Sequence, residues 1–210
     1  MLNKKKSENK KKLIFFGYGS HLKVVKEIAQ LNNFEIKGII CDGFQKKKKI
    51  YTIPYLGDRS YLKNINKKET LFFIAIGENK LREKIFKMLK KKGFQFAKLI
   101  HPTALISKSS SIKEGTTICA KSIINPNSFI GQNCIINSAS LIEHDVKIKN
   151  HCHIAPGVKI GGQTSIGTRS FIGIGSTIID KIKIIKDTIV GAGSLVVKHC
   201  KTSGVYLGRP

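Results

Sequence analysis

The chain has 210 residues and carries 38 Lys and Arg residues against 13 Asp and Glu residues, a formal net charge of +25. Only four of the 38 are arginine, whereas nucleic-acid recognition usually relies on arginine and on stacked aromatic side chains. The composition therefore argues against nucleic acid as the partner. The positive charge suits smaller phosphorylated ligands equally well, and an AT-rich coding bias would also enrich Lys, Ile and Asn.

The first residues predict neither a secretory signal nor a membrane anchor. Residues 1–12 are rich in lysine and no apolar signal stretch follows them, so we expect a basic disordered tail. No apolar run in the chain is long enough to span a membrane. The five cysteines form no CxxC pair, which predicts a reduced, cytoplasmic protein.

Residues 13–100 alternate between apolar strand patterns and helical patterns. Strands are expected at 13–16, 34–41, 71–76 and 95–100, with helices near 22–31 and 80–92 and a short helix capped by Asp58. Residues 45–49 read as a basic loop. This β-α-β order predicts a small parallel, Rossmann-like sheet that binds a nucleotide.

Glycine-rich turns follow two of the expected strands. Gly17 and Gly19 precede a helix, whose free backbone N–H groups suit an anion. The motif lacks the full G-x-G-x-x-G pattern, which argues against NAD. Asp42 follows the second strand, where an acidic residue meets a ribose or simply makes a turn, and Gly77 ends the third.

An aliphatic residue recurs at every sixth position from Ile106 to Val196, sixteen times in one phase. A small residue lies two positions earlier in nearly every repeat, and Ile182 is the clear exception. This period predicts a left-handed parallel β-helix over residues 101–210, in which three hexads form one coil and residues eighteen apart stack. Cys134 and Cys152 are therefore expected to stack as core thiols.

The hexads resemble those of the hexapeptide-repeat acyltransferases. The segments Ile142–Ile148 and His151–Gly157 are similar to one branch, the bacterial nucleotide-amino-sugar N-acetyltransferases and sialic-acid O-acetyltransferases. The resemblance extends over the N-terminal domain. It implies a homotrimer in which acetyl-CoA lies along the groove between two β-helices.

The resemblance also implies the reaction and its residues. His144 matches the general base and Asp145 its acidic partner, with Glu143 beside them as a further carboxylate that can orient the ring. His153 matches a residue near the acetyl group, and we infer that it meets the His144 of a neighbouring subunit. We expect His151 to be solvated, and we expect no metal site because Cys152 points inward.

Further residues are implied by the same resemblance to contact the substrates. The acetyl-CoA residues are His153, Gly162 as an oxyanion donor through its N–H group, and Ile174 and Ala192 along the pantetheine. The residues for a UDP-linked sugar are Gly17, Gly19, His21, Asp42, Gly77 and Asn79. The family usually has a second acid beside Asp42, where this chain has Cys41.

These expectations favour N-acetylation of a UDP-linked 4-amino-deoxysugar for surface glycan synthesis. O-acetylation of a sialic acid or related nonulosonate is an alternative, because the sequence around His144 fits both reactions. A non-catalytic hexapeptide scaffold is an alternative of another class.

Overall fold

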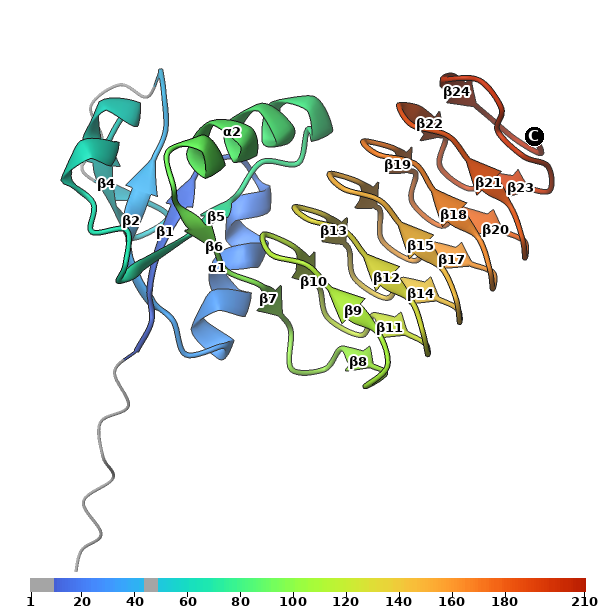
Figure 1. The fold of residues 1–210 in the computed structure, drawn as a ribbon, viewed down its shortest axis with the longest axis horizontal. Coiled ribbons are helices and arrows are strands. Elements are labelled where there is room, and N and C mark those ends of the chain that lie inside the picture. The colour runs from blue at the N-terminus through green and yellow to red at the C-terminus, as the bar shows by residue number, and fades with distance from the viewer. Residues whose placement is uncertain (1–9, 44–48) are drawn as a thin grey trace, which may run out of the picture.

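The computed structural model describes residues 10–43 and 49–210, which form a small α/β unit followed by a long stack of triangular coils (Figure 1). The expected basic tail lies mostly outside the described residues, as does the basic loop at 45–49 apart from Lys49. The first unit contains β1 (Lys12–Phe16), α1 (His21–Leu31), β2 (Glu35–Ile40), β3 (Lys49–Ile50), β4 (Ile53–Gly57), the 3-10 helix η1 (Arg59–Asn64), β5 (Thr70–Ile74), α2 (Asn79–Lys91) and β6 (Gln95–Phe96).

The first unit is a six-stranded sheet with the order β3-β4-β2-β1-β5-β6. Its strands are parallel except for the β3–β4 pair. The helices α1 and α2 begin after β1 and β5, and they pack their apolar sides on two separate clusters of sheet residues. Asp58 caps η1 by accepting a hydrogen bond from the Ser60 N–H at 2.8 Å.

The second unit is the predicted left-handed β-helix, with three parallel sheets that we name by face. The first face contains β7 (Leu99–Ile100), β10 (Thr117–Ile118), β13 (Ile135–Ile136), β16 (His153–Ile154), β19 (Phe171–Ile172), β22 (Thr188–Val190) and β24 (Gly204–Tyr206). The second face contains β8 (Leu105–Ile106), β11 (Ile123–Ile124), β14 (Leu141–Ile142), β17 (Lys159–Ile160), β20 (Thr177–Ile178) and β23 (Leu195–Val196). The third face contains β9 (Ser111–Ile112), β12 (Phe129–Ile130), β15 (Lys147–Ile148), β18 (Ser165–Ile166) and β21 (Lys183–Ile184).

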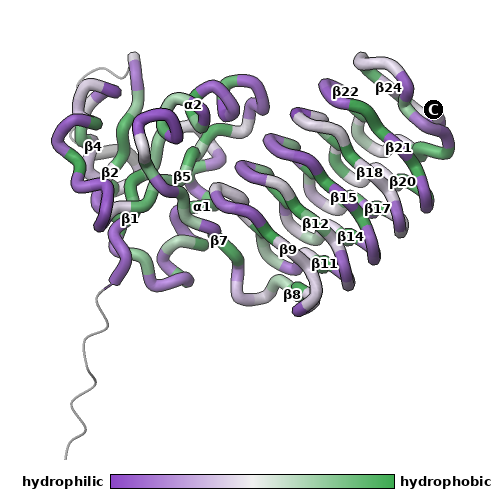
Figure 2. The backbone as a smooth tube through the Cα atoms, in the orientation of Figure 1, coloured by the Kyte–Doolittle hydropathy of each residue, from purple (hydrophilic) through white to green (hydrophobic). Residues whose placement is uncertain are grey.

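Each predicted hexad places its aliphatic residue at the end of a short strand, pointing into the coil. Figure 2 shows the resulting pattern, in which apolar strands alternate with polar turns along the stack. Residues eighteen apart pair in register, as Ile136 does with Ile154. Cys134 and Cys152 are both free and buried in this core, which confirms the expected stacking.

Three corners connect the faces and recur with the same period. Corner I joins the first face to the second (137–140, 155–158, 173–176, 191–194), and corner II joins the second to the third (143–146, 161–164, 179–182). Corner III joins the third face to the first (149–152, 167–170, 185–187) and faces the first unit. Each corner contains a residue with positive φ, for example Asp145 at 60° and His151 at 62°.

The strand expected at 95–100 is divided in the structure. β6 pairs with β5 of the first sheet, whereas β7 pairs with β10 of the β-helix. Ile100 lies six residues before Ile106 and so continues the hexad phase. The segment was read as one strand because Phe96 and Leu99 are both buried, although they belong to different sheets.

Candidate functional site

A cavity of about 640 Å³ opens at the carboxyl ends of β1, β2 and β5. Such an edge is where open parallel sheets bind their ligands. Five of the six residues expected to contact a nucleotide sugar line this nucleotide cavity, namely Gly17, Gly19, His21, Asp42 and Gly77. The structure therefore brings five of the six predicted residues together in one cavity.

The turn between β1 and α1 needs its first glycine. Gly17 has φ of +99°, and a Cβ atom there would lie 2.6 Å from the Cγ1 atom of Ile76. Ser20 lies at the N-cap of α1 but does not use its side chain to cap the helix. The N–H groups of Leu22 and Lys23 in the first turn instead donate to the carbonyl oxygens of Gly19 and Ser20, at 3.0 and 3.1 Å.

Asp42 is held by an arginine that the sequence analysis did not single out. The Nη2 atom of Arg59 donates to Oδ2 of Asp42 at 2.6 Å, and its Nε atom donates to Oδ1 at 3.0 Å. This hydrogen-bonded pairing lowers the pKa of Asp42. Both side chains line the nucleotide cavity, so a cation accompanies the carboxylate there.

Asn79 is the exception among the six expected residues, because it does not line the nucleotide cavity. Its Nδ2 atom donates to the carbonyl oxygens of Arg169 and Ser170, at 2.9 and 3.1 Å. Its Oδ1 atom accepts from Nη2 of Arg82 at 2.7 Å. In this structure the amide therefore joins the first unit to corner III instead of facing the nucleotide cavity.

A second hollow, of about 450 Å³, lies between the first unit and the first face of the β-helix. We call it the histidine groove, because His153 lines it together with Gly77, Phe171 and Ile189. The His153 ring makes an edge contact with Phe171, with 5.1 Å between the ring centroids. Since Gly77 also lines the nucleotide cavity, the two hollows meet at this residue.

One histidine lies on each side of the junction, His21 in the nucleotide cavity and His153 in the histidine groove. Burial, with a smaller contribution from the nearby Arg82 charge, lowers the pKa of His153 to about 4. Burial and the neighbouring His153 lower the pKa of His21 to about 3. Both rings are therefore neutral near pH 7, and the buried Nε2 atom of His21 has no hydrogen-bond partner among the described residues.

His144 lies at corner II, away from both hollows. Its Nδ1 atom is 2.8 Å from Oδ2 of Asp145, and this hydrogen bond is the main reason that the pKa of His144 is raised. Glu143 lines the second face instead and raises the same pKa only through its charge. About half of the His144 side chain is exposed, so a ligand can reach the imidazole.

Gly162 lies directly under the His144 ring, but its backbone N–H group is not free. A Cβ atom at Gly162 would lie 2.8 Å from Cε1 and Nε2 of His144, so only glycine allows this ring position. Its N–H group donates to Oδ1 of Asp180 at 2.7 Å. The expected oxyanion donor is therefore already bonded to a carboxylate, and the close approach to His144 explains the glycine instead.

Ile174 and Ala192 stack at corner I, and both are exposed. The Gly193 N–H group donates to the Ile174 carbonyl oxygen at 2.8 Å, which joins their two coils. Within one chain this column lies on a different corner from His144.

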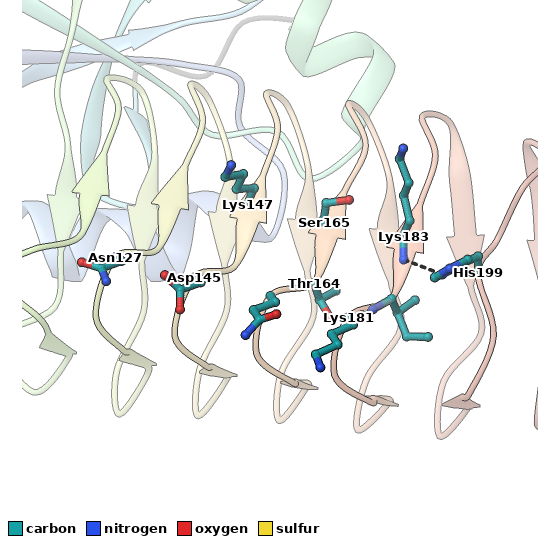
Figure 3. Close-up of a pocket in the computed structure, with 10 residues that line it drawn as sticks. Asn127, Asp145, Lys147, Thr164, Ser165, Lys181, Lys183 and His199 are labelled. Atoms are coloured by element: carbon teal, nitrogen blue, oxygen red, sulfur yellow. Dashed lines mark hydrogen bonds between the residues drawn. The ribbon is translucent and has the colours of Figure 1, made fainter.

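A basic groove of about 580 Å³ runs along corner II and the third face. Figure 3 shows it crossing successive coils from Asn127 to His199. Lys147, Lys181, Lys183 and His199 line it, and Asp145 is the one carboxylate among its lining residues. The groove therefore suits an anionic group on the same side of the chain as the His144–Asp145 pair.

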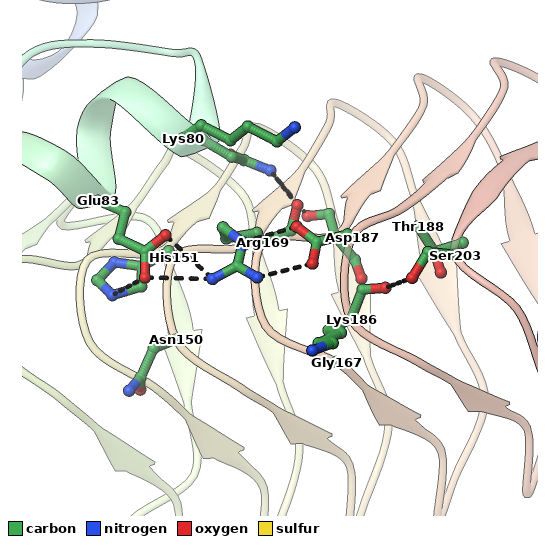
Figure 4. Close-up of polar contacts among 12 residues, drawn as sticks. Lys80, Glu83, Asn150, His151, Gly167, Arg169, Lys186, Asp187, Thr188 and Ser203 are labelled. Carbon is green, nitrogen blue, oxygen red and sulfur yellow. Dashed lines mark hydrogen bonds and ion pairs between the residues drawn. The ribbon is translucent and has the colours of Figure 1, made fainter.

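His151 was expected to be solvated, but its residue surface is only 5% exposed. Its ring contacts Phe86, and its Nδ1 atom lies 2.9 Å from Nδ2 of Asn133. Glu83 of α2 lies beside it and also accepts from Arg169, which pairs with Asp187 at 2.6 Å (Figure 4). The polar side chain of His151 at corner III therefore contacts α2 and not solvent.

Two further kinds of site were sought in the described residues, a metal site and a membrane-spanning helix. Among residues 10–43 and 49–210, no group of three or more His, Cys, Asp or Glu side chains is arranged to hold a metal ion. Neither α1 nor α2, nor any other helix within these ranges, has the length and apolar character needed to cross a bilayer.

Two family models match separate parts of the chain. The PglD N-terminal domain matches residues 12–89, and the bacterial transferase hexapeptide of six repeats matches residues 127–162. A curated relative, UDP-N-acetylbacillosamine N-acetyltransferase of Bacillus subtilis (strain 168), is 33% identical over 114 residues. That match spans about half the length of the relative, 52% of it and 52% of this chain.

Solved structures match over nearly the whole chain. A variant of perosamine N-acetyltransferase from Caulobacter crescentus, in complex with CoA and GDP-perosamine, is 32% identical, with a TM-score of 0.88 and 93% of each chain covered. The acetyltransferase domain of PglB from Neisseria gonorrhoeae FA1090, in complex with acetyl coenzyme A, is 28% identical, with a TM-score of 0.88, and the match covers 95% of this chain and 97% of that one. The chain therefore belongs to the family of nucleotide-amino-sugar N-acetyltransferases built on hexapeptide repeats.

Proposed function

We propose that the protein transfers the acetyl group of acetyl-CoA to the amino group of a nucleotide-linked 4-amino-deoxysugar. The observation that carries the proposal is the exposed His144–Asp145 pair at corner II, on a chain that also has a nucleotide cavity at its sheet edge. A UDP sugar is our first choice of acceptor. The relatives are named for both a UDP sugar and a GDP sugar, so the assay must compare acceptors that carry uracil with acceptors that carry guanine.

The positions of the expected residues support a site between subunits. His153 lies beside the nucleotide cavity of its own chain, whereas His144 lies on another corner. In a homotrimer of side-by-side β-helices, corner II of one chain faces the histidine groove and corner I of the next. His144 of one subunit then lies beside His153, Ile174 and Ala192 of its neighbour.

In the proposed step, the sugar amine attacks the thioester carbonyl carbon of acetyl-CoA. His144 accepts a proton from the amine as the new C–N bond forms, and Asp145 stabilises the imidazolium that results. The C–S bond then breaks, and the CoA thiolate leaves and is protonated. The neutral His153 beside the acetyl group adds no positive charge that would disfavour the charge developing on the amine nitrogen as it attacks.

The basic groove supports acetyl-CoA as the donor. Coils are about 4.8 Å apart, so the three coils between Asp145 and His199 span about 14 Å. An extended pantetheine arm is about as long as four extended amino-acid residues, and it therefore spans roughly the same distance. The phosphates of the donor therefore meet Lys181, Lys183 and His199 when the thioester is at His144.

The proposal is tested by the release of free thiol from acetyl-CoA. We expect release with UDP- or GDP-linked 4-amino-deoxysugars, at a rate proportional to the enzyme concentration, and an amide product by mass spectrometry. Release with sialic acid alone would favour the O-acetyltransferase alternative. A trimer that releases no CoA with any of these acceptors would contradict enzymatic function and favour a scaffold.

The pH dependence of the reaction should report the His144–Asp145 pair. Only a neutral imidazole accepts a proton, so kcat/KM should rise as the pH rises through the pKa of His144. Asp145 raises that pKa above its ordinary value of 6.5. In Asp145→Asn the rise in a pH–rate profile should therefore move to lower pH, with a smaller movement in Glu143→Gln. An unchanged midpoint in Asp145→Asn would contradict His144 as the titrating base.

A further inference from the structure

Arg82 is a fully enclosed arginine that binds carbonyl groups from both units of the chain. Its residue surface is 1% exposed. From α2 it donates to the carbonyl oxygens of Gly77 at 2.7 Å and Asn133 at 3.0 Å. Its Nη2 atom also donates to the carbonyl oxygens of His151 at 2.9 Å and Cys152 at 3.1 Å.

No carboxylate forms a salt bridge with Arg82 among the described residues. Burial lowers the pKa of Arg82 to about 10, so the guanidinium still carries its charge near pH 7. An isolated buried charge is costly unless all its donors are satisfied. The backbone carbonyls that it binds are therefore held in place by a strong, charge-assisted set of hydrogen bonds.

Two carbonyl groups that accept from Arg82 lie next to His153, because Gly77 lines the histidine groove together with His153 and Cys152 precedes His153 in the chain. The Gly77 backbone also raises the pKa of His153, against the larger effect of burial, as expected for a carbonyl group near the imidazole. The Nε2 atom of His153 lies 3.4 Å from Nδ2 of Asn137, whose Oδ1 atom accepts from the Ser138 N–H. Because the Asn137 amide nitrogen can only donate, Nε2 of His153 is the acceptor and Nδ1 carries the proton.

We propose that Arg82 is a positioning residue, which holds the Gly77 carbonyl so that His153 is fixed as the Nδ1–H tautomer. The Nε2 lone pair then faces corner I, where Ile174 and Ala192 lie on the following coils. Gly77 also forms part of the nucleotide cavity wall. One guanidinium therefore sets the position of the nucleotide-cavity wall and the orientation of His153 together.

The test compares Arg82→Gln with the wild-type full chain, labelled with ¹⁵N-histidine. Two-bond ¹H–¹⁵N spectra distinguish the two tautomers, and His153→Phe assigns the signal. We expect the wild-type His153 to be the Nδ1–H tautomer and Arg82→Gln to show a mixture. If the proposed acetyl transfer is correct, kcat should also fall by about 10- to 100-fold with KM for both substrates nearly unchanged, because a small misplacement of a positioned group is costly. Arg82→Lys should recover part of the kcat.

The matched control is Asn32→Ala, which removes two other hydrogen bonds between the same units. Asn32 bonds to both backbone groups of Ile100, at 2.7 and 3.0 Å, and touches neither hollow. This variant should keep the His153 tautomer and the kcat. A wild-type His153 protonated at Nε2, or an unchanged tautomer in Arg82→Gln, would overturn the proposal. If Arg82→Gln does not fold, the His153 tautomer is compared between the wild type and Arg82→Lys instead, and the same tautomer in both at a reduced kcat would also overturn the proposal. A wild-type chain with the expected tautomer but no acetyl transfer would contradict only the proposed function.

Discussion

Replacing His144 by alanine is expected to lower kcat for acetyl transfer by about 10²- to 10⁴-fold, the usual contribution of a positioned general base. The side chain is half-exposed, and Asp145 is its one hydrogen-bond partner in the part of the chain that the structure describes, so its removal leaves the β-helix core untouched. The thermal midpoint should therefore stay close to that of the wild type. Steady-state kinetics with acetyl-CoA and the amino sugar provide the measurement, and a differential-scanning experiment confirms that the variant is folded.

His101→Ala is the control for this prediction. His101 is also in a turn of the β-helix, where its Nδ1 atom bonds to Thr103, but it lies outside every hollow described above. Its substitution should leave kcat and KM unchanged. If His144→Ala retains kcat within a few-fold of the wild type, then His144 is not the base and the chemical step must be assigned to another group.

Replacing Ile178 by alanine is expected to lower the free energy of unfolding by about 2–5 kcal/mol, as for other buried isoleucines. Its residue surface is 1% exposed, and it stacks in register between Ile160 and Val196. Each coil contacts only its neighbours, so the cavity left behind weakens two interfaces of the stack. Urea unfolding followed by circular dichroism gives the change, which corresponds to a fall in thermal midpoint of several degrees.

The next residue provides the comparison. Ile179 has the same side chain, but it points out of corner II and is 43% exposed. Ile179→Ala should change the free energy of unfolding by no more than about 0.5 kcal/mol. Similar losses in the two variants would mean that the hexad phase does not determine which isoleucine is in the core.

The β-helix could be predicted from sequence because each coil repeats one local rule. The inward position is filled by Ile or Val in all sixteen repeats, and every one of them ends a strand or forms part of the core. Ile100 also lies in this phase, but the prediction began the repeat at Ile106 and assigned residues 95–100 to one strand, so it missed the change of sheet at residues 97–98. Periodicity identifies an inward residue without identifying the sheet to which it belongs.

The interface between the two units was not predictable in the same way. Arg82 lies in a helix with several lysines, which are typical of an exposed surface, so the sequence gave no sign that this one cation is buried. His151 was expected to be solvated, yet its ring packs against Phe86 of the opposite unit. Asn79, which was predicted to bind the substrate, lines the histidine groove and also bonds to corner III. The spacing of polar residues along a chain does not reveal which of them a second unit covers. The Asp180 partner of Gly162 lies exactly one coil away, and the eighteen-residue spacing is the signal that could have found it.

The unbroken phase of the stack has a consequence for how the enzyme can change during evolution. Gain or loss of eighteen residues, or a multiple of eighteen, between Asp145 and His199 would keep all three faces aligned and would alter the distance between the His144–Asp145 pair and His199, by about 4.8 Å for each coil. Any other length change would turn every later side chain to a new face. The distance between the His144–Asp145 pair and the far end of the basic groove can therefore change only in steps of one coil. If the donor binds as we propose, a donor with a longer or shorter arm requires added or removed coils and not altered side chains.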